Sequence, residues 1–150
     1  MAHTYSNLLC HLVFSTKHRI PFVSDALREP LYDYMGGIVR QNGGALLECG
    51  GMPDHVHLLV RLKTDPSVAA VVQKIKGKSS KWVNDGGLLR EDFRWQQGYG
   101  AFSVSESGAD KVRRYLRNQQ HHHRKVSYID ELVTLLERHH IPYRMEDLLE

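Results

Sequence analysis

The sequence of 150 residues contains only two cysteines, Cys10 and Cys49, and no CxxC or other zinc-finger spacing. Both lie in segments predicted to be strands, so we expect buried free thiols in a reducing compartment rather than disulfides. No stretch approaches the ~20 apolar residues that a membrane span requires. No basic segment followed by a long apolar run indicates a signal peptide. We therefore expect a cytoplasmic protein without membrane association.

The sequence also lacks a large excess of charge of either sign. Twenty Lys and Arg residues stand against 17 Asp and Glu residues, which gives a formal net charge of +3. This mild excess permits a polyanionic partner but does not require one. The hydrophobic content of 41% is ordinary for a globular protein, and there is no repeat, low-complexity tract or linker. We expect a single domain over residues 1–150 with a real core.

Hydrophobic periodicity predicts an α+β fold with the element order β-α-β-β-α-β followed by two helices. Residues 5–16 are apolar on both faces, as in a central strand. A helix is expected over 24–41, regular from near Glu29 with Pro30 at its first position, followed by a strand over 45–49 that turns at Gly50-Gly51 into a strand over 52–62. The next helix is capped by Asp65 with Pro66 at its first position, and a strand over 93–104 follows it. The last two elements are a helix over 109–122 and a helix from Ser127 with the core stripe Ile129, Leu132, Val133 and Leu136. This order is typical of a ferredoxin-like antiparallel sheet with two additional C-terminal helices.

The segment His55-Val56-His57 is the most informative part of the chain. It lies in the alternating strand 52–62, so His55 and His57 point to one face while Val56 points to the other. Neutral imidazole is the commonest metal-binding side chain, and two imidazoles on one strand face form half of a metal site. Taken alone, the same pair is also explained as ordinary surface residues.

A second group of polar side chains lies on the helix predicted over 109–122. Tyr115 and Gln119 are four residues apart and share a face, which His122 continues. Gln119 is therefore a candidate third ligand beside His55 and His57. Two imidazoles and an amide oxygen suit Mn²⁺ well and Mg²⁺ moderately, and zinc also accepts two histidines.

Such a site suits phosphodiester cleavage. A divalent ion stabilises charge that develops on a phosphoryl oxygen, while the hydroxyl of Tyr115 attacks phosphorus and forms a covalent ester. A hydroxyl of another strand then attacks that ester and rejoins the DNA. Because the ordinary pKa of tyrosine lies well above neutral pH, a base or water must take the proton.

At this point the chain resembles the HUH single-tyrosine transposases, which include the smallest insertion-sequence transposases and the REP-associated tyrosine transposases. The resemblance covers nearly the whole chain. It lies in the segments 11–17, 52–60, 95–102 and 115–119, with the length and element order in agreement.

This resemblance implies more than the residues alone do. It implies action on single-stranded DNA with hairpin ends, Mg²⁺ or Mn²⁺ as cofactor, and a 5′-phosphotyrosine intermediate with a free 3′-hydroxyl. It also implies a homodimer in which the tyrosine helix docks in cis or in trans. Carried over by position, His55, His57 and Gln119 are metal ligands and Tyr115 is the nucleophile.

Several of these assignments have rivals in the sequence. Tyr99 and Tyr128 are alternative nucleophiles, although neither has a glutamine four residues on. The run 121–123 is all histidine, but consecutive helical residues point about 100° apart and do not converge on one ion. We therefore interpret the run as a solvated segment, with His122 alone near the scissile phosphate.

Basic and aromatic residues are candidate DNA contacts, with a solvated helix face or core packing as the alternative. The aromatic candidates for base stacking are Trp95 and Tyr99. The basic candidates are Lys17 and Arg19, the helical stripe Lys74, Lys78 and Lys81, and Arg113, Arg114 and Arg117 around Tyr115.

Two alternative functions accompany the transposase interpretation. A domesticated REP-associated nickase would use the same site, and genomic context distinguishes it from a mobile element. A non-catalytic nucleic-acid-binding module has the same sheet architecture, but no RNP-like aromatic strand is present in the sequence.

Overall fold

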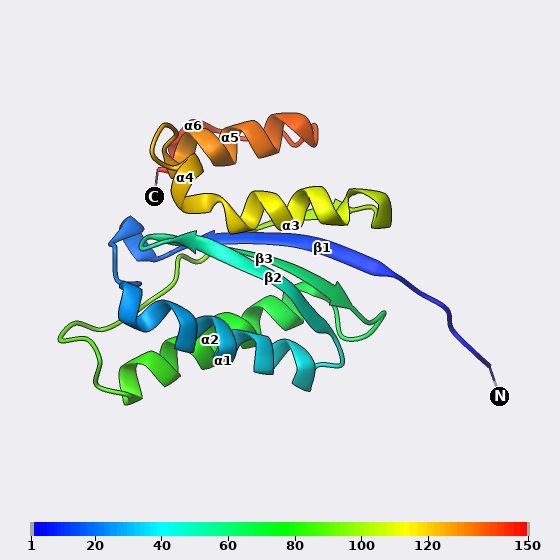
Figure 1. Cartoon of the computed structure of the whole chain (residues 1–150), viewed down its shortest axis with the longest axis horizontal. Coiled ribbons are helices and arrows are strands. Elements are labelled where there is room, and N and C mark those ends of the chain that lie inside the picture. Colours follow the sequence, from blue (N-terminus) through cyan, green and yellow to red (C-terminus); the bar gives the residue numbers. More distant parts are fainter. Residues whose placement is uncertain (1, 150) are drawn as a thin grey trace.

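The computed structural model describes residues 2–149, and its centre is a four-stranded antiparallel sheet with the strand order β2-β3-β1-β4. Helices cover both faces of this sheet: α1 and α2 lie on one side, and α3 to α6 on the other (Figure 1). The predicted α+β class and ferredoxin-like order are confirmed. The elements are β1 (Leu8–Ser15), η1 (Lys17–Arg19), α1 (Asp25–Gln41), β2 (Ala45–Met52), β3 (His55–Leu62), α2 (Val68–Asp85), β4 (Gly100–Val104), η2 (Glu106–Gly108), α3 (Ala109–Arg117), α4 (Gln119–His122), α5 (Tyr128–Arg138) and α6 (Met145–Leu148).

The larger core lies between the sheet and the helices α1 and α2. From β3 it receives Val56, Leu58, Val60 and Leu62, the face that strand alternation predicted to be apolar. β1 pairs with β3 along its whole length and with β4 on its other side, so it is the central strand that its two apolar faces predicted.

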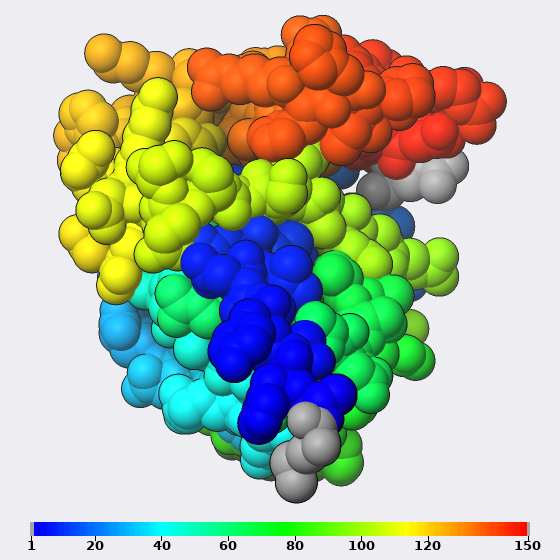
Figure 2. Space-filling model, turned by 90° about the vertical axis from the view of Figure 1, so that its right-hand side faces the viewer, coloured from blue at the N-terminus to red at the C-terminus, as the bar shows by residue number. Residues whose placement is uncertain are grey.

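A smaller core covers the opposite face of the sheet. Val13 of β1 and Phe102 of β4 pack there against the buried stripe of α5, which consists of Tyr128, Leu132, Leu135 and Leu136. In the space-filling view, the C-terminal helices in orange and red form the top of the molecule, above the yellow-green α3 (Figure 2). The second layer therefore holds α5 over the sheet face that carries His55 and His57.

The starts of two helices differ from the prediction. Helix α1 begins at Asp25, and Pro30 lies inside it, because the hydroxyl of Ser24 accepts a hydrogen bond from the backbone of Leu27 and fixes the first turn. In the same way Ser67, rather than Asp65, caps α2 by accepting a hydrogen bond from the backbone of Ala70.

The glycines at positions 50 and 51 do not form the predicted turn. They belong to β2, which continues to Met52, so the chain reverses at Pro53 and Asp54. Gly50 is required for packing: a Cβ atom there would lie 1.9 Å from the carbonyl oxygen of Leu116 in α3. The absent side chain lets the tyrosine-bearing helix approach the sheet.

The second half of the chain is more segmented than the sequence predicted. Strand β4 begins only at Gly100, and the preceding segment touches the sheet through a single bridge between Thr16 and Trp95. The helix predicted over 109–122 breaks at Asn118, which separates α3 from α4. The cap of α5 by Ser127 is confirmed, since its hydroxyl accepts from the backbone of Asp130.

Near the C-terminus the chain forms the one-turn helix α6. Cys10 and Cys49 are free thiols, as expected. Within residues 2–149, no helix is both long enough and apolar enough to cross a bilayer.

Candidate active site

A buried polar cluster lies between β3 and the C-terminal helices, and Glu131 of α5 is its centre. His55 and His57 project from β3 toward this glutamate, because strand alternation turns both of them away from the larger core. Glu131 is only 2% exposed. A buried carboxylate is costly unless charged or polar partners surround it, and here each carboxylate oxygen has its own set of partners.

The oxygen Oε1 of Glu131 faces histidines. The Nε2 nitrogen of His57 lies 2.8 Å away, that of His123 lies 3.1 Å away, and that of His55 lies 3.5 Å away. A carboxylate oxygen has two lone pairs, so three nitrogens exceed what it accepts in hydrogen bonds. Correspondingly, His123 Nε2 is buried and has no hydrogen-bond partner among residues 2–149.

The oxygen Oε2 of Glu131 faces the proposed nucleophile. The hydroxyl of Tyr115 donates a hydrogen bond to it, and the amide nitrogen of Gln119 donates another at 2.9 Å. The Nε2 nitrogen of His122 lies 3.3 Å from the same oxygen. One carboxylate thus connects the two histidines of the strand with the tyrosine of α3.

The two strand histidines differ in protonation. Burial lowers the pKa of His57, so its ring is neutral at neutral pH. Burial also opposes protonation of His55, but the carboxylates of Asp54 and Glu131 outweigh burial and raise its pKa to about 9. His55 Nδ1 lies 2.8 Å from Asp54 Oδ1, and its Nε2 lies 3.2 Å from Gln119 Oε1, so both ring nitrogens face acceptors.

Protonation of the glutamate and the tyrosine is also fixed by their surroundings. Burial favours the neutral form of Glu131, but His123, His55 and His57 outweigh it and hold its pKa well below the usual range. Burial, followed by the carboxylate of Glu131, raises the pKa of Tyr115 above its ordinary value. Before any cation binds, the site therefore holds a carboxylate and a protonated tyrosine.

The donor set fits a divalent cation. One ligand atom from each of His55, His57, His123 and Glu131 lies within 4.8 Å of the others. Imidazole nitrogens with one carboxylate oxygen suit Mn²⁺, and they also accept zinc. A cation at this point would take up the excess of nitrogens around Oε1.

The predicted site residues are brought together, although not all for the predicted reason. Gln119 is buried and contacts His55 as expected, but it begins α4 rather than continuing the helix of Tyr115. Within the histidine run, His121 is exposed as expected, but the interpretation was wrong for His123. His122 ends α4 and His123 is its C-cap residue, and the rings of both reach Glu131, each at a different carboxylate oxygen.

Three residues of the cluster were missed in the sequence. Asp54 precedes the histidine motif, and His11 lies on the polar face of β1, where its Nε2 is 2.8 Å from His57 Nδ1. Glu131 interrupts the apolar stripe of α5, which runs through Leu135 and not through Val133 as predicted. A charged residue in a core stripe was the signal that pointed to it.

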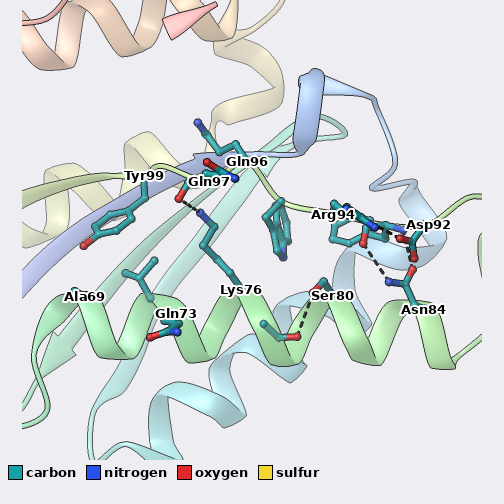
Figure 3. A pocket seen from close by; sticks show the side chains of 14 residues that line it. Ala69, Gln73, Lys76, Ser80, Asn84, Asp92, Arg94, Gln96, Gln97 and Tyr99 are labelled. Carbon is teal, nitrogen blue, oxygen red and sulfur yellow. Dashed lines mark hydrogen bonds and ion pairs between the residues drawn. The ribbon is translucent and has the colours of Figure 1, made fainter. Parts of the chain in front are cut away.

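The rival nucleophiles are placed differently from Tyr115. The hydroxyl of Tyr128 donates to Gln96 at 3.2 Å. Tyr99 lies on the other side of the sheet, beside α2 (Figure 3). Tyr115 is therefore the one of these three whose hydroxyl contacts Glu131.

The predicted basic contacts are spread over both sides of the molecule. Lys74, Lys78 and Lys81 are exposed on α2, on the side of the sheet away from the cluster (Figure 1), and Lys81 pairs with Asp85 at 2.8 Å. Arg113 and Arg117 approach Glu48 of β2, at 3.6 Å and 2.8 Å.

The remaining basic candidates lie nearer the ends of the sheet. Arg114 is exposed on α3, close to the proposed nucleophile. Lys17 is exposed on η1, whereas Arg19 donates to the carbonyl oxygens of Leu148 and Leu149, at 3.5 Å and 3.4 Å. Arg113 and Arg19 therefore have internal contacts, and Arg114 and Lys17 face solvent.

A separate pocket of about 550 Å³ lies between α2 and the segment 92–99 (Figure 3). Lys76 crosses it and donates to the backbone oxygens of Gln97 and Gly98 at 3.2 Å and 2.8 Å. Trp95 is buried and donates to Ser79 Oγ at 2.9 Å, which is a core role. Tyr99 is 40% exposed, so of the two candidate stacking residues it is the one that presents its ring to solvent.

Known proteins resemble this chain over most of its length. The ISDra2 transposase TnpA of Deinococcus radiodurans is 27% identical over 122 residues, which cover 73% of this chain and 81% of that protein. The transposase of insertion sequence element IS200 from Salmonella typhimurium is 27% identical over 124 residues, covering 79% and 81%.

Two solved structures share the fold. A putative transposase from Deinococcus radiodurans aligns with a TM-score of 0.65 and 27% identity, over 79% of this chain and 95% of that chain. A REP-associated tyrosine transposase bound to a REP hairpin aligns with a TM-score of 0.58 and 12% identity, over 79% and 70%. The family model for IS200-like transposases matches residues 4–119, which include both histidines, Tyr115 and Gln119. The chain therefore belongs to the family of IS200-like transposases.

Proposed function

We propose that this protein cleaves and rejoins single-stranded DNA through Tyr115, with a divalent cation held by His55 and His57. The observation that carries the proposal is the convergence of the Tyr115 hydroxyl and the two histidine Nε2 nitrogens on the single carboxylate of Glu131. A nucleophile, a candidate cation site and a hydrogen-bond acceptor lie within one buried cluster, and membership of the family supplies the reaction class.

The tyrosine oxygen attacks phosphorus in line with the bond to the 3′-oxygen. The bond between Tyr115 Oη and phosphorus forms, and the bond from phosphorus to the 3′-oxygen breaks. Glu131 Oε2 accepts the hydrogen bond of the phenol and orients its oxygen. The phenolic proton is lost to solvent, and the departing 3′-oxygen takes up a proton from solvent. The products are a 5′-phosphotyrosine and a strand with a free 3′-hydroxyl, and attack by a 3′-hydroxyl on the ester rejoins DNA.

A bound divalent cation would supply charge stabilisation at the phosphoryl oxygens. His57 is already neutral and suited to ligation, whereas His55 must first lose a proton. Gln119 Oε1 lies 3.2 Å from His55 Nε2, which keeps this amide available as the third ligand. We propose Mn²⁺ or Mg²⁺ as the cofactor, with Mn²⁺ the better match to imidazole donors.

Docking of the tyrosine helix in cis or in trans stays open, as the sequence left it. The homodimer expected from the sequence stays a prediction. Hairpin DNA is the substrate to test first, because a REP-associated transposase with this fold has been solved with a REP hairpin. Exposed Lys17 and Arg114 are the basic side chains that we propose contact phosphates near the site.

The test uses single-stranded oligonucleotides that cover the DNA flanking the gene, with Mn²⁺ or Mg²⁺ added. We expect a protein–DNA adduct that survives denaturing electrophoresis and carries the downstream fragment through its 5′ end. Tyr115→Phe removes only the attacking oxygen, so it should abolish the adduct and leave DNA binding nearly intact. Tyr99→Phe is the matched control and should keep the adduct.

Two outcomes would contradict the proposal. An adduct that persists in Tyr115→Phe would assign the nucleophile to another residue. Tight hairpin binding without any adduct, under either metal, would favour a non-catalytic binding module.

A further inference from the structure

We infer that Glu131 is a metal ligand supplied by the C-terminal helix α5, and that its second oxygen positions Tyr115 beside the ion. This inference rests on the proposed function and deepens it, because it adds an anionic ligand to the set His55, His57 and Gln119. Glu131 lies twelve residues beyond Gln119, where the match to the family model ends. The added ligand is thus outside the part of the chain that defines the family.

The first observation is the gathering of imidazole nitrogens around Oε1 of Glu131. Three imidazole Nε2 nitrogens point at this oxygen, from His57 at 2.8 Å, His123 at 3.1 Å and His55 at 3.5 Å. In the metal-free protein the carboxylate is the anion around which these nitrogens gather, and it can accept hydrogen bonds from at most two of them through this oxygen. A cation placed there would be bound by the carboxylate oxygen and by neutral histidines together.

The second observation is the unsatisfied Nε2 nitrogen of His123. It is buried, it faces the carboxylate, and it forms no hydrogen bond within residues 2–149. A buried polar atom without a partner is energetically costly, and a bound cation would satisfy it. Its position within 4.8 Å of the other three donors makes it the fourth member of one coordination group.

The third observation concerns the hydrogen bonds to Oε2 of Glu131. This oxygen accepts hydrogen bonds from the Tyr115 hydroxyl and from Gln119 Nε2. When Oε1 binds an ion, Oε2 of the same carboxylate holds the attacking oxygen of Tyr115 beside that ion. Glu131 is therefore a positioning residue for the nucleophile.

The last observation is the way α5 packs on the sheet. The helix is attached to the sheet by an apolar stripe that includes Leu132 and Leu136, against Val13 and Phe102. Glu131 lies in the same stripe, so an ion bound by it would also link α5 to β3. Cation binding should thus stabilise the docked position of the C-terminal helix.

The experiment titrates the full chain, stripped with chelator and free of DNA, with Mn²⁺ by calorimetry and by the electron paramagnetic resonance signal of free Mn²⁺. We expect Glu131→Gln to weaken Mn²⁺ binding by at least about tenfold. Asp130→Asn, the exposed neighbour with the same charge change, should bind like the wild type. Glu131→Asp retains a carboxylate and should recover part of the loss.

Hydrogen exchange supplies a readout that does not depend on the variants. In the wild type, Mn²⁺ should increase protection of residues 128–138. No added protection, or unchanged affinity in Glu131→Gln, overturns the inference. If His57→Ala weakens Mn²⁺ binding while Glu131→Gln does not, only this inference fails. If His57→Ala also binds Mn²⁺ normally, the proposed cation site itself fails.

Discussion

The Nε2 nitrogen of His11 lies 2.8 Å from the Nδ1 nitrogen of His57, and this contact joins the two central strands at the candidate active site. Burial, followed by the repulsion that a protonated His57 would exert, lowers the pKa of His11 to about 3, so His11 is neutral. A neutral His11 accepts a hydrogen bond from His57 Nδ1 when His57 Nε2 is free of a proton. Without a cation, Nε2 of neutral His57 donates to Glu131 Oε1 at 2.8 Å, and Nδ1 accepts from His11. With a cation on Nε2 the proton would lie on Nδ1, and His11 would support that tautomer as its acceptor.

His11→Leu should weaken Mn²⁺ binding by about tenfold, because the ring of His57 loses the partner that fixes its tautomer and orientation. Leucine is apolar and suits this buried position in β1, so the fold should persist. Calorimetric titration with Mn²⁺ measures the effect, and circular dichroism checks the fold. An unchanged affinity would limit His11 to packing.

The stability of the metal-free protein should depend on the protonation of His55. Its pKa of about 9 in the folded chain exceeds the value of 6.5 expected when unfolded. Protonated His55 thus stabilises the fold fully below pH 6.5, and this contribution is lost as pH rises from 6.5 to 9. The loss is up to about 3 kcal/mol.

Urea unfolding at pH 6, 7.5 and 9, in the presence of chelator, measures this loss. Asp54→Asn removes a carboxylate that lies 2.8 Å from His55 Nδ1 and should flatten the decline. Comparing the two proteins cancels the titration of other groups. Parallel declines in the wild type and in Asp54→Asn would show that the Asp54–His55 pair does not contribute.

Gly50→Ala should disrupt the approach of α3 to the sheet. The new Cβ atom would lie 1.9 Å from the carbonyl oxygen of Leu116, which is backbone and has no rotamer to change. We expect destabilisation by about 2–3 kcal/mol and loss of DNA cleavage, since Tyr115 precedes Leu116.

Gly77→Ala is the matched control for that substitution. Nothing lies within 4 Å of a Cβ atom at this exposed position in α2. Alanine favours helix by about 1 kcal/mol over glycine, so this variant should be as stable as the wild type or more so. Thermal unfolding of both variants gives the comparison, and similar melting temperatures would contradict the packing role of Gly50.

The part of the site that the sequence predicted is the part that local periodicity fixes. Alternation along residues 52–62 puts His55 and His57 on one face and Val56 on the other, whatever the rest of the chain does. The cap at Ser127 is equally local, because a hydroxyl and a backbone N–H three residues on are sufficient to form it.

The part that was missed depends on contacts between distant segments. Glu131 meets the histidines only because the chain reverses between α4 and α5 and returns α5 over β3. Local rules assigned the helix but misplaced part of its buried face, with Val133 in the stripe and without Glu131 and Leu135. The break at Asn118 is a second such case, because it starts the short helix α4, at whose end His122 and His123 meet Glu131.

The contribution of Gln119 can be separated from that of the strand histidines. Its amide oxygen lies 3.2 Å from His55 Nε2, and its amide nitrogen donates to Glu131 Oε2 at 2.9 Å. Gln119→Ala removes a neutral ligand that a water molecule replaces, whereas His57→Ala removes an imidazole that lies 2.8 Å from Oε1. Cleavage measured over a Mn²⁺ titration should therefore weaken in Gln119→Ala and recover at high metal, while His57→Ala stays inactive throughout. Full activity of Gln119→Ala at every Mn²⁺ concentration would remove Gln119 from the ligand set and leave His55, His57, His123 and Glu131 as the donors.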